Sequence, residues 1–200
     1  MDLKKRLQIL SVVAIVVALI SIWLTTGNQV IYLFWLLIPV TWLAVSKKPE
    51  EIGITKTNIS KAIIFGLVVG IFVGSIKYFS SSQMPWLISG FLKYTAEYVP
   101  KVGILTYIVM IIVGDAIREL FYRGFIQTRF MKRFSPVIAI FFTAILLGLT
   151  DQVEGVYSII DATANGIISG YLFYRTKNLA ASIVFMPTVF IIILLLSSLA

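Results

Sequence analysis

The feature that most constrains this chain is a succession of apolar segments, each about as long as a bilayer is thick. A helix needs roughly 20 apolar residues to cross about 30 Å of hydrocarbon. Segments of this kind lie at residues 8–26, 29–46, 60–79, 101–121, 136–151, 154–174 and 178–199. We therefore expect an all-α polytopic membrane helix bundle with about seven transmembrane helices.

The composition supports a membrane protein and excludes a soluble domain. Hydrophobic residues make up 59% of the chain and charged residues 13%, and the mean hydropathy is +0.97. A soluble domain carries about 45–50% apolar and about 25% charged residues. The 200 residues leave room for one helical bundle and for no large soluble domain.

The net charge of +8 reflects membrane topology rather than nucleic-acid binding, because the basic residues cluster between apolar segments. If the spans alternate, one side carries the clusters at residues 4–6, 47–61, 123–133 and 175–177. Positive residues are retained on the cytoplasmic side. We expect a multi-pass protein of a prokaryotic plasma membrane with a cytoplasmic N-terminus, in contact with membrane lipids and not with nucleic acid.

Two apolar segments need separate interpretation. Residues 9–24 follow a basic start and resemble a signal peptide, but no small-residue cleavage site follows, so we interpret them as an uncleaved first span. Residues 84–99 are shorter and mix Trp86, Lys93, Tyr94 and Glu97, which favours an interfacial helix over a span.

Two segments carry glycines four residues apart, at positions 66, 70 and 74 and at positions 166 and 170. Such glycines share a helix face and allow the backbones of two helices to approach closely. They could form a gate or a ligand groove, or they could serve tight helix packing. We favour packing.

Ionisable residues inside a membrane are costly and require a partner or a function. The candidates are Asp115, Arg118, Glu119, Arg123, Asp151 and Asp161. The i,i+4 spacing of Glu119 and Arg123, and the i,i+3 spacing of Asp115 and Arg118, bring each pair together on a helix. This pattern predicts either a polar site at the cytoplasmic end of the 101–121 span or two structural ion pairs.

The run from Arg118 to Phe125 resembles the Glu-Glu-x-x-x-Arg motif of the CPBP family, the type II CAAX prenyl proteases and bacteriocin-processing proteins, which are intramembrane endopeptidases. Residues 127–136, 147–151 and 165–176 resemble the family as well, so that the similarity covers roughly residues 100–195. The resemblance implies a CPBP-like core bundle at residues 101–200, preceded by N-terminal helices and an interfacial helix at residues 1–100.

The resemblance also implies a set of catalytic positions, most of which have changed. The first glutamate, which activates water, falls at Arg118, while the second is retained as Glu119 and the arginine as Arg123. The histidine of the second motif falls at Asp151, and the phenylalanine of that motif falls at Leu147. The histidine and asparagine of the third motif fall at Met186 and Phe190.

These changes predict a catalytically degenerate protein, a pseudoenzyme. An arginine stays protonated and cannot take a proton from water. The chain contains no His and no Cys, so we expect no metal and no cofactor. We expect it to bind a membrane protein or a lipidated peptide in the ancestral cavity.

Three alternatives remain open at the level of the sequence. Asp115, Glu119 and Asp151 could form a rearranged carboxylate site in an active endopeptidase. Arg118 could instead form a buried clasp with Asp115 and Asp151 that performs no chemistry. Finally, Asp115, Asp151 and Asp161 could line the path of a small transporter or channel subunit.

Overall fold

The computed structural model describes residues 30–151 and 155–199, and these residues form a bundle of α-helices. The predicted first span at residues 8–26 lies outside the described residues. The long helices are α2 (Val30–Ser46), α3 (Ile59–Ser80), α4 (Ser89–Val102), α5 (Ile104–Glu119), α7 (Pro136–Leu149), α8 (Val156–Thr176) and α9 (Leu179–Leu199). The short elements are the 3-10 helices η1 (Pro49–Ile52) and η2 (Pro85–Leu87), the π-helix η3 (Leu120–Gln127) and α6 (Thr128–Met131).

The helix ends follow local sequence signals. Helix α7 begins after Ser135, whose hydroxyl accepts a hydrogen bond from the backbone N–H of Ile138 at 3.4 Å, and Pro136 occupies the first turn. Helix α4 ends at Val102 and is followed by Gly103, where φ is +80°. The predicted apolar segments from residue 29 onward thus correspond to helices, with ends that differ by a few residues except at residue 121, where the helix continues.

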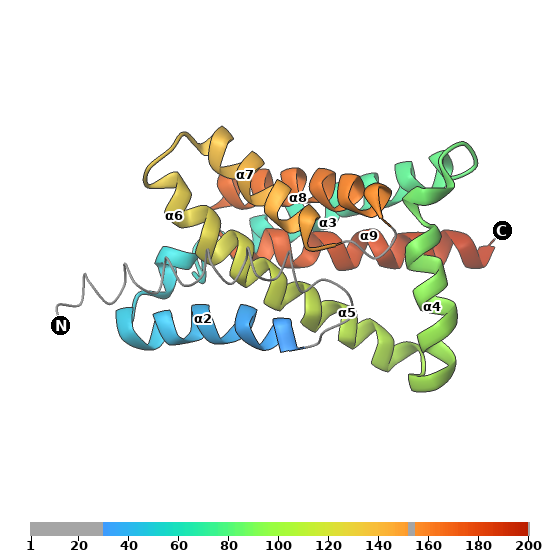
Figure 1. Cartoon of the computed structure of the whole chain (residues 1–200), viewed down its shortest axis with the longest axis horizontal. Helices are drawn as coiled ribbons and strands as arrows, with labels where there is room; N and C mark the ends of the chain where they lie inside the picture. Colours follow the sequence, from blue (N-terminus) through green and yellow to red (C-terminus); the bar gives the residue numbers. More distant parts are fainter. Residues whose placement is uncertain (1–29, 152–154, 200) are drawn as a thin grey trace.

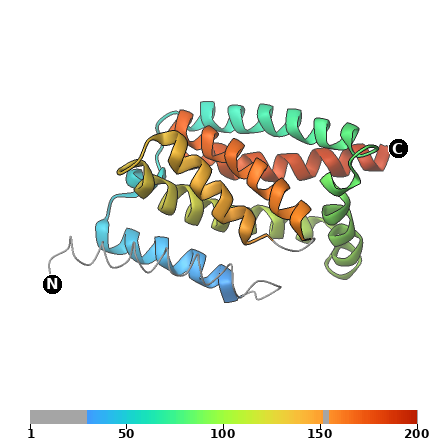
Figure 2. The same ribbon diagram turned by 45° about the horizontal axis from the view of Figure 1, so that its top comes forward.

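Helix α3 lies directly on the backbone of α9, and the two run side by side along the long axis of the molecule (Figures 1 and 2). A Cβ atom at Gly70 would lie 2.8 Å from the carbonyl oxygen of Phe185, and one at Gly74 would lie 2.9 Å from that of Val189. A Cβ atom at Gly66 would collide with the carbonyl oxygen of Ala181. The packing interpretation of the first glycine series is confirmed.

Helix α4 crosses the end of the bundle at which the chain terminates, roughly perpendicular to α9 (Figure 1). It buries none of its residues fully. The predicted separate helix is therefore present, although it starts later than expected because η2 occupies Pro85–Leu87. Its orientation suits an amphipathic helix that lies in the plane of a membrane surface.

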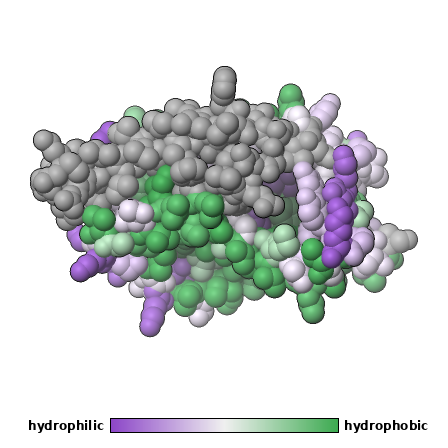
Figure 3. Space-filling model, turned by 60° about the horizontal axis from the view of Figure 1, so that its bottom comes forward, coloured by the Kyte–Doolittle hydropathy of each residue, from purple (hydrophilic) through white to green (hydrophobic). Residues whose placement is uncertain are grey.

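The outer surface is strongly apolar in its middle. Figure 3 shows hydrophobic residues across the centre of one face and hydrophilic residues toward its two ends. Among the described residues, two helices are long and apolar enough to cross a membrane, Ile59–Ser80 and Leu179–Leu199. These two helices support a membrane protein, and the other spans stay predictions.

Candidate functional site

Helix α5 does not end where the sequence predicts. It continues without a break through η3 and α6 to Met131, so that Glu119 lies in the middle of a long helix and not at its end. The expected end position is wrong because the residues after Phe121 look polar in sequence but are buried against other helices. A π-helical segment is often found at functional sites.

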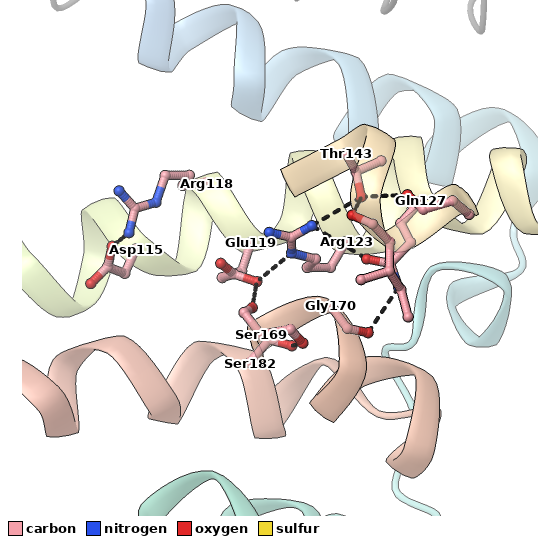
Figure 4. A network of polar contacts seen from close by, with 11 residues as sticks. Asp115, Arg118, Glu119, Arg123, Gln127, Thr143, Ser169, Gly170 and Ser182 are labelled. Atoms are coloured by element: carbon pink, nitrogen blue, oxygen red, sulfur yellow. Dashed lines mark hydrogen bonds and ion pairs between the residues drawn. The ribbon is translucent and has the colours of Figure 1, made fainter. Parts of the chain in front are cut away.

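Arg123 is the centre of a buried polar network that joins α5 to α7 and α8 (Figure 4). Its guanidinium is 0% exposed. Nη1 donates to the hydroxyl of Thr143 at 3.0 Å and to Oε1 of Gln127 at 3.4 Å. Nε lies 3.4 Å from Oε2 of Glu119, and Ser169 donates to the same oxygen at 2.5 Å. The predicted pairing of Glu119 with Arg123 is thereby confirmed.

The glycines of α8 make room for this network. A Cβ atom at Gly166 would lie 3.0 Å from Nη2 of Arg123, and one at Gly170 would lie 2.9 Å from Oε1 of Gln127. Gln127 also donates to the carbonyl oxygen of Gly170 at 2.9 Å. These glycines therefore serve close packing, as expected, but what they accommodate is a buried polar cluster as well as a neighbouring helix.

Arg118 takes part in a second set of ion pairs. Its guanidinium contacts the carboxylate of Asp115 one turn earlier, as the spacing predicts, and lies 3.9 Å from the carboxylate of Asp151. The Arg118 side chain is 18% exposed and the Asp115 side chain 7%. Asp151 follows the end of α7, so Arg118 links α5 to that end. These contacts have the geometry expected of the clasp.

A further ion pair, between α3 and α8, was not predicted from the sequence. The ammonium of Lys77 on α3 lies 2.6 Å from the carboxylate of Asp161 on α8, and Asn165 donates to the same carboxylate at 3.0 Å. Lys77 is 7% exposed. A lysine in the interior of a predicted span was the available signal, because such a residue requires a partner. Asp161 therefore has a structural partner. The alternative in which Asp161 lines the path of a transporter or channel gave it none.

These groups surround a cavity of about 330 Å³. Among the residues that line it are Arg118, Glu119, Leu147, Asp151, Met186 and Phe190. The cavity thus gathers positions that the family resemblance links to catalysis, although they come from α5, α7, α9 and the loop after α7. Lys77 and Asp161 line it as well.

The outer wall of the cavity is aromatic and comes from η2 and α4. Trp86, Phe91 and Tyr94 line it on this side. Phe91 stacks on Phe190 of α9 with ring centroids 4.6 Å apart, and Trp86 stacks on Tyr157 of α8 at 5.5 Å. Helix α4 therefore closes one end of the cavity through ring contacts.

Residues 100–186 match the family model described as Type II CAAX prenyl endopeptidase Rce1-like. No curated protein and no solved structure matches the chain significantly. The resemblance deduced from the motifs is confirmed over this region. Phe190 lies beyond it, so its correspondence with the family asparagine stays a prediction.

The chemistry available to the cavity is that of paired charges beside aromatic rings. Arg118 is held by Asp115, Lys77 by Asp161, and Glu119 by Arg123. Within the described parts of the chain, no three His, Cys, Asp or Glu side chains gather in a way that could hold a metal ion. The walls therefore offer hydrogen-bond donors and acceptors to a ligand in an otherwise apolar space.

Proposed function

We propose that this chain is a membrane protein of the CPBP type whose central cavity binds a membrane partner or a lipidated peptide without hydrolysing it. The observation that carries the proposal is Arg118. It stands where the family resemblance puts the water-activating glutamate, it lines the cavity, and Asp115 holds its guanidinium in an ion pair. A guanidinium in this position cannot act as a general base.

The other departures from the family pattern act in the same direction. Met186 and Phe190 line the cavity at the positions of a histidine and an asparagine. A histidine could bind a metal or donate a hydrogen bond to a developing oxyanion. A thioether and a phenyl ring supply neither function, but both add apolar contact area to a bound ligand.

Binding suits the cavity better than hydrolysis does. Its volume of about 330 Å³ lies within the range of about 300–1,000 Å³ that is usual for ligand sites, which are mostly apolar with a few fixed polar groups. Glu119 is fixed by Ser169 and Arg123, and the aromatic wall comes from η2 and α4. These features favour an amphipathic ligand with its apolar part against the rings.

Affinity purification of the full chain from native membranes, followed by mass spectrometry, tests the proposal. Ala162 is buried and lines the cavity, whereas Ala164 on the same helix is exposed. We expect wild type and Ala164→Phe to retain the same intact partner and Ala162→Phe to lose it. A thermal melt of each variant shows whether the bundle is preserved.

The same experiment distinguishes the enzyme alternative. Partner fragments that share one cleavage site, and that disappear in Glu119→Gln, would refute the binding proposal and establish a rearranged endopeptidase. Asp115→Asn and Asp151→Asn would then show whether these carboxylates take part, because the rearranged site requires both.

A further inference from the structure

A second pocket, which shares no lining residue with the central cavity, lies beside α5 and α9, and its wall residues Ile117 and Leu120 flank Arg118 and Glu119 in the sequence. It is an apolar groove of about 390 Å³ between α2, α5, α9 and the loop that follows η1. Its apolar walls include Leu36, Ile54, Ile117, Leu120 and Ile183. We call this pocket the α2–α9 groove.

The rim of the α2–α9 groove is fixed by hydrogen bonds between two loops. The amide of Asn178 donates to the carbonyl oxygens of Thr55 and Thr57 at 2.9 and 3.0 Å. The backbone N–H of Leu179 donates to the carbonyl oxygen of Gly53 at 2.9 Å. Asn178 is 2% exposed, so the two loops are joined by a buried side chain and form a defined edge.

This edge carries two exposed lysines. Lys56 lies between the two threonines that Asn178 holds, and Lys177 immediately precedes Asn178. The structure records no ion pair for either lysine among the described residues, and Lys177 lies over the ring of Tyr174 at 4.0 Å. The nearby Glu51 is already paired with Lys132 and Lys48. Glu50 of η1 is exposed as well, so the two lysines leave the rim with a net positive charge.

We propose that the α2–α9 groove binds an anionic phospholipid, with an acyl chain in the groove and the phosphate at Lys56 and Lys177. The walls supply apolar contact and the rim supplies charge complementarity. Basic pockets between transmembrane helices on the cytoplasmic side bind anionic lipid headgroups, and both lysines belong to the clusters that the topology assigns to the cytoplasm. The site is independent of the central cavity and of its proposed function.

Lipid competition on the purified full chain tests this proposal. The protein is delipidated, incubated in micelles with equal amounts of phosphatidylglycerol and phosphatidylcholine of the same chain length, and analysed for retained lipid by native mass spectrometry. We expect enrichment of phosphatidylglycerol in wild type. Each lysine near a membrane surface changes affinity for anionic lipid roughly fivefold, so Lys56→Gln with Lys177→Gln should abolish the enrichment.

Two further variants separate charge from shape. Lys93→Gln with Lys101→Gln removes the same charge on the side of the membrane that the predicted topology places opposite Lys56 and Lys177. This pair of changes should leave the enrichment intact. Ile183→Trp fills the groove and should reduce retention of both lipids. Ile64 is 60% exposed and does not line the groove, so Ile64→Trp supplies the matched control.

Four results would overturn the proposal. The first two are equal retention of the two lipids by wild type and enrichment that survives loss of both lysines. The third is a thermal melt in which inorganic phosphate raises the Tm as much as phosphatidylglycerol does. The fourth is a disulfide-linked dimer of Ile183→Cys. The last result is clear because the chain has no other cysteine, and it would mean that a second copy occupies the groove.

Discussion

The contact between α3 and α9 yields the sharpest prediction, because glycines of α3 face the backbone of α9. A Cβ atom at Gly66 would collide with the carbonyl oxygen of Ala181 and lie 3.2 Å from its carbonyl carbon. Ordinary carbon contacts are about 3.5–4.0 Å. Since a helix backbone cannot rotate away as a side chain can, Gly66→Ala must push the two helices apart.

The magnitude follows from two opposing effects. Overpacking of this kind costs about 1–3 kcal/mol, and a rigid obstacle favours the upper end. Alanine is about 1 kcal/mol better than glycine inside a helix. Gly66→Ala should therefore lose about 2 kcal/mol, which corresponds to about 4–8 °C in Tm for a chain of this size.

Gly114 on α5 is the matched control, because a Cβ atom there would meet no atom within 4 Å. Gly114→Ala should gain about 1 kcal/mol from helix propensity. Thermal unfolding of both variants in the same detergent measures the difference, about 3 kcal/mol. If Gly66→Ala melts at or above wild type, α3 does not rest on the backbone of α9 as described. The position of Lys77 on α3 relative to Met186 on α9, which both line the cavity, would then be wrong as well.

Three further predictions concern the ion pairs. Arg118→Ala should lower stability by about 3 kcal/mol, because it leaves a buried carboxylate unpaired; an unchanged Tm would contradict the clasp. Arg123→Ala should cost more, about 4 kcal/mol or above, because Arg123 is 0% exposed and Arg118 is 18% exposed; the reverse order in a thermal melt would contradict this ranking. At the surface, the hydrogen bond from Lys132 lowers the pKa of Glu51 below its usual 4.5. Lys132→Gln should therefore cost about 0.5 kcal/mol near pH 7. That difference should disappear as the pH falls through the folded-state pKa, below 4.5, and a cost that persists in acid would mean that Lys132 acts by another route.

The helices could be predicted from sequence because charged residues and turn residues interrupt the apolar segments. Lys47 and Lys48 follow α2, the pair Ser135–Pro136 starts α7, and Lys177 separates α8 from α9. Each boundary depends on residues within a few positions of it, and local signals of this kind need no knowledge of the fold.

The continuation of α5 could not be predicted in this way. Gln127 and Arg129 look like the polar residues that follow a span. In the folded chain Gln127 donates to a carbonyl oxygen of α8, and the guanidinium of Arg129 lies over the rings of Trp42 and Phe125 at 4.6 and 3.3 Å. Gly170 and Trp42 belong to distant segments, whereas Phe125 lies one turn earlier on the same helix, so tertiary contacts contribute to the stability of a helix through these residues.

In the candidate site, too, local contacts could be predicted from the sequence and contacts between distant segments could not. The i,i+3 and i,i+4 pairs were predictable because helix geometry alone sets their spacing. The pair of Lys77 and Asp161 joins residues that are 84 positions apart, and no local pattern selects one partner among the carboxylates of the later helices. The family resemblance pointed to several residues that line the cavity, but it gave no information on the pair of Lys77 and Asp161.

The contact between Arg118 and Asp151 predicts that the two side chains are energetically coupled. Asp115 already pairs with the guanidinium of Arg118, and the carboxylate of Asp151, 3.9 Å away, is a second partner from the other side of the cavity. Reverting Arg118→Glu alone would bring a further carboxylate next to Asp115 and Asp151, where like charges repel.

Adding Asp151→His to Arg118→Glu should relieve that repulsion, since an imidazole can donate a hydrogen bond to the new carboxylate. The double variant should therefore be more stable than the sum of the two single changes predicts, by about 0.5–3 kcal/mol, the usual coupling of residues in contact. Thermal unfolding of wild type, both single variants and the double variant at pH 7 measures this coupling. Strict additivity would mean that the two side chains do not interact in the folded chain, and the contact between Arg118 and Asp151 would then contribute nothing to stability.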